Sequence, residues 1–257
     1  MQADWTAVTV TNPEGAAPVV LVCEHASCDI PADLDGLGLS EKARTSHAAW
    51  DIGAADMAIE MARLLDAPLV AAGVSRLVYD LNRPLDSKSA IPETSEIFDI
   101  PGNRGLSEVD RRDRFDRLHT PFHVQLADTV AAQQARVGGP VALITIHTFT
   151  PVFFGKQRAV EIGYLFHANG GLAKAALKAE GQAGRYKAAL NEPYAATDGV
   201  THTLRMQGED HGLPSLMIEV RNDLVDTPES ARAMAAHLVE VLVSALKGVA
   251  DQQEAAE

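Results

Sequence analysis

The 257-residue sequence is poor in cysteine and in positive charge. Its two cysteines, Cys23 and Cys28, could form a disulfide in principle, but so few cysteines are more typical of a reduced cytosolic protein. Lysine and arginine number 22 against 35 aspartate and glutamate residues, which gives a net charge of −13. Because nucleic-acid binding requires clusters of lysine and arginine, this balance argues against a nucleic-acid partner. It does not exclude an anionic small molecule, which needs only a local arginine or a metal ion.

Several segments and motifs are also missing. No stretch approaches 18 consecutive apolar residues, so no membrane span is expected. Residues 1–5 lack the basic region and apolar run that begin a signal peptide. We therefore expect a cytoplasmic protein without a membrane partner. The sequence has no Gly-x-Gly-x-x-Gly or Gly-Lys-Ser/Thr loop, which argues against a nucleotide cofactor, and no Gly-x-Ser-x-Gly elbow of a serine hydrolase.

What the sequence does contain is a set of short apolar runs that end in polar groups. Four runs lead respectively into Glu24-His25, into Asp80 with Asn82-Arg83, into His147 and into Glu219; they are 19–23, 77–79 (within a predicted strand at 77–81), 141–146 and 216–218. Short apolar runs of this kind are typical of strands that are buried on both faces of a parallel sheet. Ligands of such sheets bind just beyond the carboxyl ends of the strands. The four runs therefore predict one shared site.

The spacing of apolar residues between these runs predicts the rest of the fold. The expected helices are 47–65, 107–136, 171–181 and 228–246; the further expected strands are an edge strand within 1–17, 68–71, 159–166 and an extended piece at 201–204. Residues 85–106 form a long irregular segment, either a binding loop or a disordered insertion, and residues 248–257 form an acidic, frayed tail. Strands alternate with helices without repeats or linkers. This order predicts one α/β domain over 1–257, with a mixed, mostly parallel central sheet and helices on both faces.

Two histidines at the ends of predicted strands, His25 and His147, indicate a metal site. A single histidine in such a position is more often a structural hydrogen-bonding group, but two near one crevice favour zinc. A catalytic zinc takes three protein ligands and one water molecule. Candidates for the third ligand are Glu24, His47, Asp51 and Asp80. We favour Asp51, because His47 and Asp51 would share one face of a helix, whereas alternation along a strand points Glu24 away from His25.

Glu219 is the candidate general base. A carboxylate that follows a buried strand could take a proton from a metal-bound water molecule and then protonate the leaving nitrogen. The alternative is a salt bridge between Glu219 and Arg221, which lies two residues further on the same face of the strand.

Arginines near the strand ends could bind a carboxylate of the substrate. The planar guanidinium group grips a carboxylate through two parallel hydrogen bonds. Asn82-Arg83 would place such a group beside the metal, and Arg76 lies on the same segment. The alternative is that these arginines pair with Asp80 or Asp86. Arg104, in the long irregular segment, and Arg221 are secondary candidates for substrate binding.

These residues occur in strings that resemble a known family. The strings are Glu24-His25-Ala26-Ser27, Trp50-Asp51-Ile52-Gly53, Ser75-Arg76-Leu77-Val78-Tyr79-Asp80-Leu81-Asn82-Arg83-Pro84, Ile146-His147-Thr148-Phe149 and Ile218-Glu219-Val220-Arg221-Asn222-Asp223. Over about residues 18–245 the chain resembles the N-formylglutamate amidohydrolase (N-formylglutamate deformylase) family, which is related to the zinc carboxypeptidases and aspartoacylases. The resemblance implies a zinc-exopeptidase-like α/β fold. In the wider group a His-x-x-Glu pair and a later histidine bind zinc. Here His25 and His147 match, but Cys28 stands where the glutamate would be, and Asp51 is our replacement, inferred from the residues.

The resemblance also implies an activity. It indicates a metal-dependent hydrolase of amino-acid catabolism that cleaves the amide bond of an N-formyl or other N-acyl amino acid, with zinc (or another divalent metal such as cobalt). Glu219 would be the general base, Arg76 would stabilise the oxyanion, and Asn82-Arg83 would bind the substrate carboxylate. The protein would be a monomer or a small homo-oligomer. Two alternatives remain at this point: a carboxypeptidase-like hydrolase of a modified peptide or cell-wall fragment, and a non-catalytic protein that binds a small carboxylate.

Overall fold

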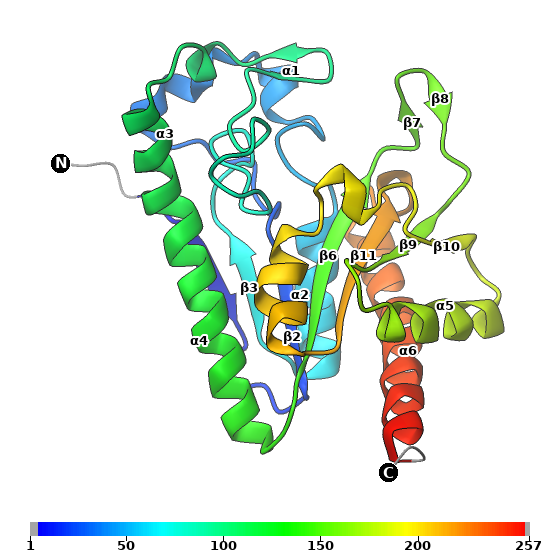
Figure 1. Ribbon diagram of the computed structural model, residues 1–257. Coiled ribbons are helices and arrows are strands. Elements are labelled where there is room, and N and C mark those ends of the chain that lie inside the picture. The colour runs from blue at the N-terminus through cyan, green and yellow to red at the C-terminus, as the bar shows by residue number, and fades with distance from the viewer. Residues whose placement is uncertain (1–4, 255–257) are drawn as a thin grey trace.

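Seven strands form one mixed sheet in the computed structural model, which describes residues 5–254 (Figure 1). The order across the sheet is β1-β3-β2-β6-β11-β9-β10. The strands of this sheet are β1 (Val8–Thr11), β2 (Val19–Cys23), β3 (Leu69–Ala72), β6 (Ala142–Phe149), β9 (Ile162–Leu165), β10 (Ala188–Leu190) and β11 (Ser215–Arg221). β3, β2, β6 and β11 run parallel to one another, whereas β1 pairs antiparallel with β3, and β9 pairs antiparallel with β11. The predicted mixed, mostly parallel sheet is confirmed.

Helices cover both faces of this sheet, as predicted. The helices are α1 (Glu41–Arg44), α2 (Ala54–Leu65), α3 (Glu108–Arg114), α4 (Thr120–Val137), α5 (Gly171–Ala183) and α6 (Pro228–Glu254). One face packs against α2, α5 and α6, and the other against α4 and the segment after β3 (Figure 1). Strand β2 shows the alternation that produces two cores: Val19 and Leu21 belong to the first, Val20 and Val22 to the second.

Helix α6 is long and apolar. Within Pro228–Asp251 an 18-residue window has a mean hydropathy of 1.5, so by length and composition this helix would suffice to cross a membrane. The expectation from sequence counted only uninterrupted apolar runs and so did not single out this alanine-rich helix. In the structure α6 packs against α2 and α5 through Ala235, Leu238 and Leu242, which are buried. Helices that cover the core of a globular protein meet the same criteria.

The predicted strand at 77–81 is wrong. This segment forms consecutive turns, in which Val78 N donates to Ser75 O and Arg83 N donates to Asp80 O. Its apolar side chains are buried because they anchor the turns in the second core, so hydrophobicity alone did not distinguish them from a strand. The segment lies over the carboxyl end of β3 (Figure 1).

The predicted helix at 47–65 begins only at Ala54. Gly53 precedes it with φ +82°, and a Cβ atom there would collide with the Val225 carbonyl oxygen. His47 and Asp51 therefore lie in turns and do not share a helical face, so the argument from their four-residue spacing is wrong. Asp51 is held instead by its main-chain N–H, which donates to the His25 carbonyl oxygen at 3.0 Å.

Other predicted elements meet mixed outcomes. The helix at 107–136 is confirmed as α3 and α4 joined by the π-helical turn Phe115–His119, and Ser107 caps its start with Asp110. The extended piece at 201–204 is wrong, because this segment is helical and leads into the π-helical turn Leu204–Gly208. Helix α6 continues through the first part of the expected frayed tail to Glu254, and 255–257 lie outside the described residues.

The irregular segment 85–106 is packed rather than a disordered insertion. It contains the two-residue strands β4 (Thr94–Ser95) and β5 (Phe98–Asp99), and Ile91 and Ile100 are buried in the second core. Asn103 Nδ2 donates to the carbonyl oxygens of Leu77 and Pro92. A second small hairpin, β7 (Val152–Phe153) and β8 (Lys156–Gln157), projects beyond the end of β6 (Figure 1).

Candidate active site

Three polar side chains form a row across neighbouring parallel strands. Glu219 in β11 is the register partner of His147 in β6, and Glu24 directly follows β2 on the other side of β6. Their neighbours Cys23, Ile146 and Ile218 face the first core, so alternation turns the three polar side chains to the opposite face. All three are buried. The carboxyl ends of three strands thus supply one site, as the apolar runs predicted.

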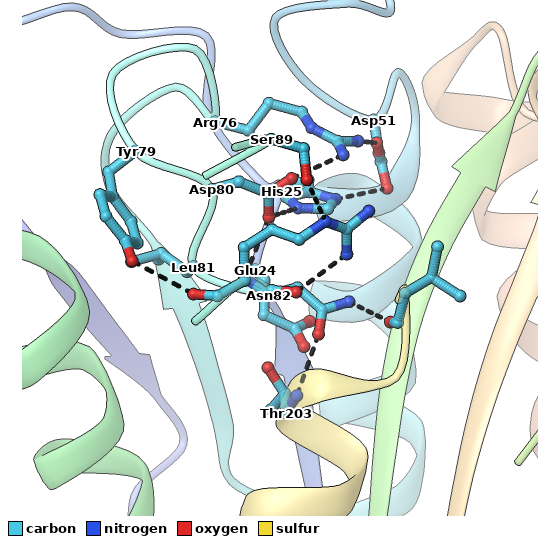
Figure 2. A network of polar contacts seen from close by, with 12 residues as sticks. Glu24, His25, Asp51, Arg76, Tyr79, Asp80, Leu81, Asn82, Ser89 and Thr203 are labelled. Atoms are coloured by element: carbon cyan, nitrogen blue, oxygen red, sulfur yellow. Dashed lines mark hydrogen bonds and ion pairs between the residues drawn. The ribbon is translucent and has the colours of Figure 1, made fainter. Parts of the chain in front are cut away.

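His25, Asp51 and His147 come together as candidate metal ligands. One ligand atom from each lies within 4.8 Å of the others. Asp51 Oδ2 is 3.3 Å from His25 Nδ1 and 2.9 Å from His147 Nδ1, and all three residues are buried. Figure 2 shows Asp51 and His25 facing one another across this centre. The selection of Asp51 thus agrees with the geometry, although the helical spacing behind it was wrong.

The other ring nitrogen of each histidine contacts a second carboxylate. His25 Nε2 lies 2.8 Å from Asp80 Oδ1, and His147 Nε2 lies 3.1 Å from Glu24 Oε2. A carboxylate on the far nitrogen fixes the ring orientation and leaves the near nitrogen, here Nδ1, free to bind a metal. Glu24 therefore supports His147 beside the candidate ligands, and Asp80 supports His25 in the same way.

The site is rich in buried carboxylates. Glu24, Asp51, Asp80 and Glu219 lie in or beside it with the guanidinium groups of Arg76 and Arg83, so histidines that bind a metal as neutral rings, with Glu219 ionised, would leave two excess negative charges. Among the described residues, Glu24 Oε1 and Glu219 Oε2 also lack a hydrogen-bond partner, whereas Glu24 Oε2 forms the ion pair with His147 Nε2. Buried carboxylates without compensation are costly. A divalent cation would compensate the excess charge, so the residues present fit a metal ion.

The pKa values follow from burial and from these neighbours. Burial raises the pKa of Glu219 to about 7, and the charge of Asp51 adds to this effect against the opposing influence of His147. Burial would also raise the pKa of Asp51, but His25 and His147 outweigh it and hold that pKa well below its usual range. Burial would lower the pKa of His147, yet Glu24 and Asp51 raise it above its usual value. Glu219 is therefore the carboxyl group best able to exchange a proton near neutral pH.

Arg76 is tied to the candidate ligands. Its Nη1 donates to Asp51 Oδ1 at 3.3 Å and its Nη2 donates to Asp80 Oδ2 at 2.8 Å (Figure 2). Burial would lower the pKa of Arg76, but Asp80 and Asp51 raise it, so the side chain stays charged. This pairing with Asp80 was the alternative considered from the sequence, and it places the guanidinium group at the edge of the site.

Comparison with known proteins agrees with this geometry. The family model described as N-formylglutamate amidohydrolase matches residues 17–225. The chain belongs to the N-formylglutamate amidohydrolase family. In structure it is similar to the gene product Atu2144 from Agrobacterium tumefaciens, with 44% identity, a TM-score of 0.92, and coverage of 95% of this chain and 96% of that one. It is also similar in fold to N-formylglutamate amidohydrolase from Ralstonia eutropha JMP134, with 20% identity, a TM-score of 0.67, and coverage of 94% and 98% respectively. No curated protein matches the sequence.

The pair Asn82-Arg83 lies beside the centre. Asn82 Oδ1 accepts from Thr203 N at 2.9 Å, and its Nδ2 donates to the Val200 carbonyl oxygen (Figure 2). Arg83 donates to the Gly199 carbonyl oxygen at 2.7 Å. Both residues line a pocket of about 140 Å³ together with the candidate ligands and Glu219. Asn82 thus fastens the segment 199–203 to the site.

Three other candidates have partners away from this pocket. Arg104 pairs with Asp99 at 3.1 Å, and Arg221 pairs with Asp223 at 2.7 Å rather than with Glu219. Neither arginine is among the residues that line the pocket. His47 pairs with Glu96 at 2.7 Å and does not belong to the ligand group.

Sequence reasoning missed Tyr194 and Arg158. A larger pocket of about 730 Å³ adjoins the small one, and the two share Arg83, Tyr194 and Val200 as lining residues. Arg158 lines the larger pocket, with its Cζ atom 4.8 Å from the Tyr194 ring centroid and 4.5 Å from that of Phe153. Neither residue follows a predicted strand, and only tertiary packing of the segments after β8 and β10 brings them to the site.

Proposed function

We propose that this protein hydrolyses the amide bond of an N-formyl or related N-acyl amino acid with the help of a divalent metal ion, most suitably zinc. The observation that carries the proposal is the buried group His25, Asp51 and His147 beside Glu219. These residues line one pocket together with Arg83. Two imidazoles and one carboxylate are a set of protein ligands typical of catalytic zinc.

The metal would be held by His25 Nδ1, His147 Nδ1 and Asp51 Oδ2. When bound there, zinc would lower the pKa of a water molecule and polarise the acyl carbonyl group. Asp80 and Glu24 support this role by fixing the two rings through their far nitrogens. Both Nδ1 atoms contact the same Asp51 oxygen, so one ion placed among them would meet all three ligands.

Glu219 would carry the proton during hydrolysis. Its Oε2 has no hydrogen-bond partner among the described residues, and its pKa of about 7 suits both uptake and release of a proton at neutral pH. The carboxylate would take the proton of the attacking water molecule and then deliver it to the departing nitrogen. Arg76, oriented by Asp51 and Asp80, would stabilise negative charge that develops on the acyl oxygen.

Arg83 and Arg158 would recognise the amino-acid part of the substrate. Arg83 lines both pockets and would hold the α-carboxylate next to the scissile bond. Arg158 has no ion-pair partner among the described residues and is surrounded by aromatic rings. Such a cation in a pocket is suited to a second carboxylate. Glu192 and Asp198 also line the larger pocket and would repel a carboxylate close to them. The proposed preference for an acidic side chain therefore depends on direct contact with Arg158.

An amine-release assay tests this function. Purified protein loaded with zinc is incubated with N-formyl-, N-acetyl- and N-carbamoylglutamate, with N-formyl-leucine and with an N-acylated dipeptide, and the free amino group is measured. We expect the highest kcat/KM for an N-acylglutamate and loss of activity in His147→Ala. Full activity of His147→Ala would overturn the metal centre. Release of amine from the dipeptide alone would instead favour a carboxypeptidase-like hydrolase, and binding without any turnover would favour a carboxylate-binding protein.

A further inference from the structure

Three histidines outside the candidate active site form a second compact group. His119 ends the π-helical turn and His123 lies one helical turn later in α4, so their side chains share one face of the helix. His202 comes from the helical segment after Gly199. One ring nitrogen from each of the three lies within 4.8 Å of the others, and the group shares no residue with His25, Asp51 and His147.

Distances in this group match those of a metal site. His119 Nε2 and His202 Nε2 lie 3.2 Å apart. For metal–nitrogen bonds of about 2.0–2.1 Å in a tetrahedron, neighbouring nitrogens are about 3.3 Å apart. The His119 and His123 ring centroids lie 4.1 Å apart, with 41° between the ring planes. The His202 ring is inclined to both, by 40° to His119 and by 80° to His123, so the three rings are not stacked in parallel.

Surrounding contacts hold two of the rings ready to bind. His123 Nε2 lies 2.9 Å from the Leu81 carbonyl oxygen, which only accepts, so Nε2 carries the proton and Nδ1 has the lone pair. Gln207 Nε2 donates to this Nδ1 at 3.4 Å, a long contact that a metal ion would replace. The Phe115 ring stacks on His119 at 4.4 Å. His119 and His123 are buried, whereas His202 is partly exposed and leaves a path for an ion and for water as a fourth ligand.

The histidines are neutral at physiological pH. Burial lowers the pKa of His119 to about 2 and that of His202 to about 4, and the neighbouring imidazoles add to the effect. Burial also lowers the pKa of His123. No salt bridge joins any of the three to a carboxylate among the described residues. Each neutral ring therefore has one unprotonated nitrogen that can bind a metal ion, and the proton between His119 Nε2 and His202 Nε2 would move to the far nitrogen of one ring on metal binding.

We propose that His119, His123 and His202 bind a second divalent transition-metal ion, zinc in particular, which fastens the segment around His202 to α4. Imidazole ligands without carboxylates favour zinc and its neighbours in the first transition series over magnesium and calcium. The ion links chain segments that are about 80 residues apart in sequence. Asn82 holds the segment around His202 from another side, through Val200 and Thr203. The role proposed for this ion is to join the two segments, since its ligands come from both of them.

Zinc stoichiometry in paired variants tests the second site. Wild type, His202→Ala, His147→Ala and His147→Ala/His202→Ala are stripped with chelator, equilibrated with zinc in slight excess, dialysed and measured by atomic emission. We expect His202→Ala to bind one zinc fewer in both backgrounds. His211→Ala, a change at an exposed histidine outside the group, is the matched control and should bind as much zinc as wild type. Unchanged zinc content in His202→Ala overturns the proposal.

The result does not depend on the candidate active site. If His147→Ala retains its zinc, the proposed function fails, but the difference caused by His202→Ala still reports on the second group. If His202→Ala does not fold, His202→Asn replaces it, with the far-ultraviolet circular dichroism spectrum of the metal-free protein as the check. Cobalt provides a second readout: we expect visible absorption bands typical of a tetrahedral site in His147→Ala, and their loss in His147→Ala/His202→Asn.

Discussion

Glu219 shows how one position in a strand acquires a chemical role. Its neighbours Ile218 and Val220 face the first core, and alternation alone turns its carboxyl group into the pocket beside His147. Burial then raises its pKa to about 7. The sequence identified the residue, but the proton affinity results from the surroundings that the fold supplies.

Replacement of Glu219 by glutamine should abolish most of the activity while the metal remains bound. Glutamine keeps the size of the side chain but cannot take a proton, so kcat should fall by about 10²–10⁴. The amine-release assay and zinc analysis measure the two effects on the same sample. A variant that keeps a third or more of the wild-type kcat would show that Glu219 is not the base.

Replacement of Arg158 by glutamine should weaken the binding of acidic substrates selectively. Loss of a charge-assisted hydrogen bond costs about 1.5–3 kcal/mol, so KM for N-formylglutamate should rise roughly 10- to 150-fold. KM for N-formyl-leucine should change little. Lys156→Gln, an exposed change on the rim of the same pocket, is the control. An equal rise of KM for both substrates would contradict a specific role of Arg158.

At the scale of elements, β9 pairs with β11 beside the strands that carry Glu24, His147 and Glu219. Gly163 is the register partner of Glu219, and a Cβ atom at this position would collide with the Glu192 carbonyl oxygen and lie 2.8 Å from Leu165 Cδ1. The absence of a side chain lets the segment that carries Tyr194 approach the strand. Close packing of the backbone thus limits this position to glycine.

Gly163→Ala should therefore destabilise the protein. Overpacking of this kind typically costs 1–3 kcal/mol, and contact with main-chain atoms leaves little room for relaxation. Urea denaturation measures the free energy of unfolding. Gly181→Ala, in helix α5 with no atom within 4 Å of the added Cβ, is the matched control and should stabilise by about 0.5–1 kcal/mol. Equal stability of both variants would show that β10 and its following segment yield to the extra methyl group.

Elements also show where sequence patterns mislead. The apolar run at 77–81 has the composition of a strand, but β2 and β1 already pair with both edges of β3, which precedes it, and its own backbone is satisfied by turns. The segment nevertheless brings Arg76, Asp80 and Asn82 to the site. The expectation of a shared site was thus correct for this run, although the element that delivers it is a series of turns.

At the scale of the whole molecule, the buried carboxylates of the site couple metal binding to stability. Metal bound only by the folded chain stabilises it by RT ln(1 + [L]/Kd), about 2.7 kcal/mol at a hundredfold excess over Kd. For a chain of this length such a loss lowers Tm by roughly 5–10 °C.

Removal of metal with a chelator should therefore lower Tm by this amount. Differential scanning calorimetry measures the shift, and addition of zinc or cobalt after removal of the chelator should restore the original Tm. Magnesium at the same concentration is the control and should not restore it, because histidine ligands disfavour magnesium. An unchanged Tm after verified removal of metal would contradict the coupling.

The sequence by itself determined the strands β2, β6 and β11 and the presence of the helices that cover them, and it identified His25, His147 and Glu219 as candidate site residues. These features follow from local hydrophobic periodicity and from the rule that parallel strands end at one edge of the sheet. The family strings around Asp80–Pro84 and Glu219–Asp223 supplied the rest of the expected chemistry.

Only the tertiary structure decided which groups share the site and how they are charged. Asp51 reaches the two histidines from a turn, Glu24 and Asp80 meet their far nitrogens, and Arg158 lines the adjoining pocket. The pairing of His119 and His123 with His202 is likewise a contact between distant segments. Such contacts depend on side-chain direction, burial and the packing of segments far apart in sequence, and local patterns carry no information about these.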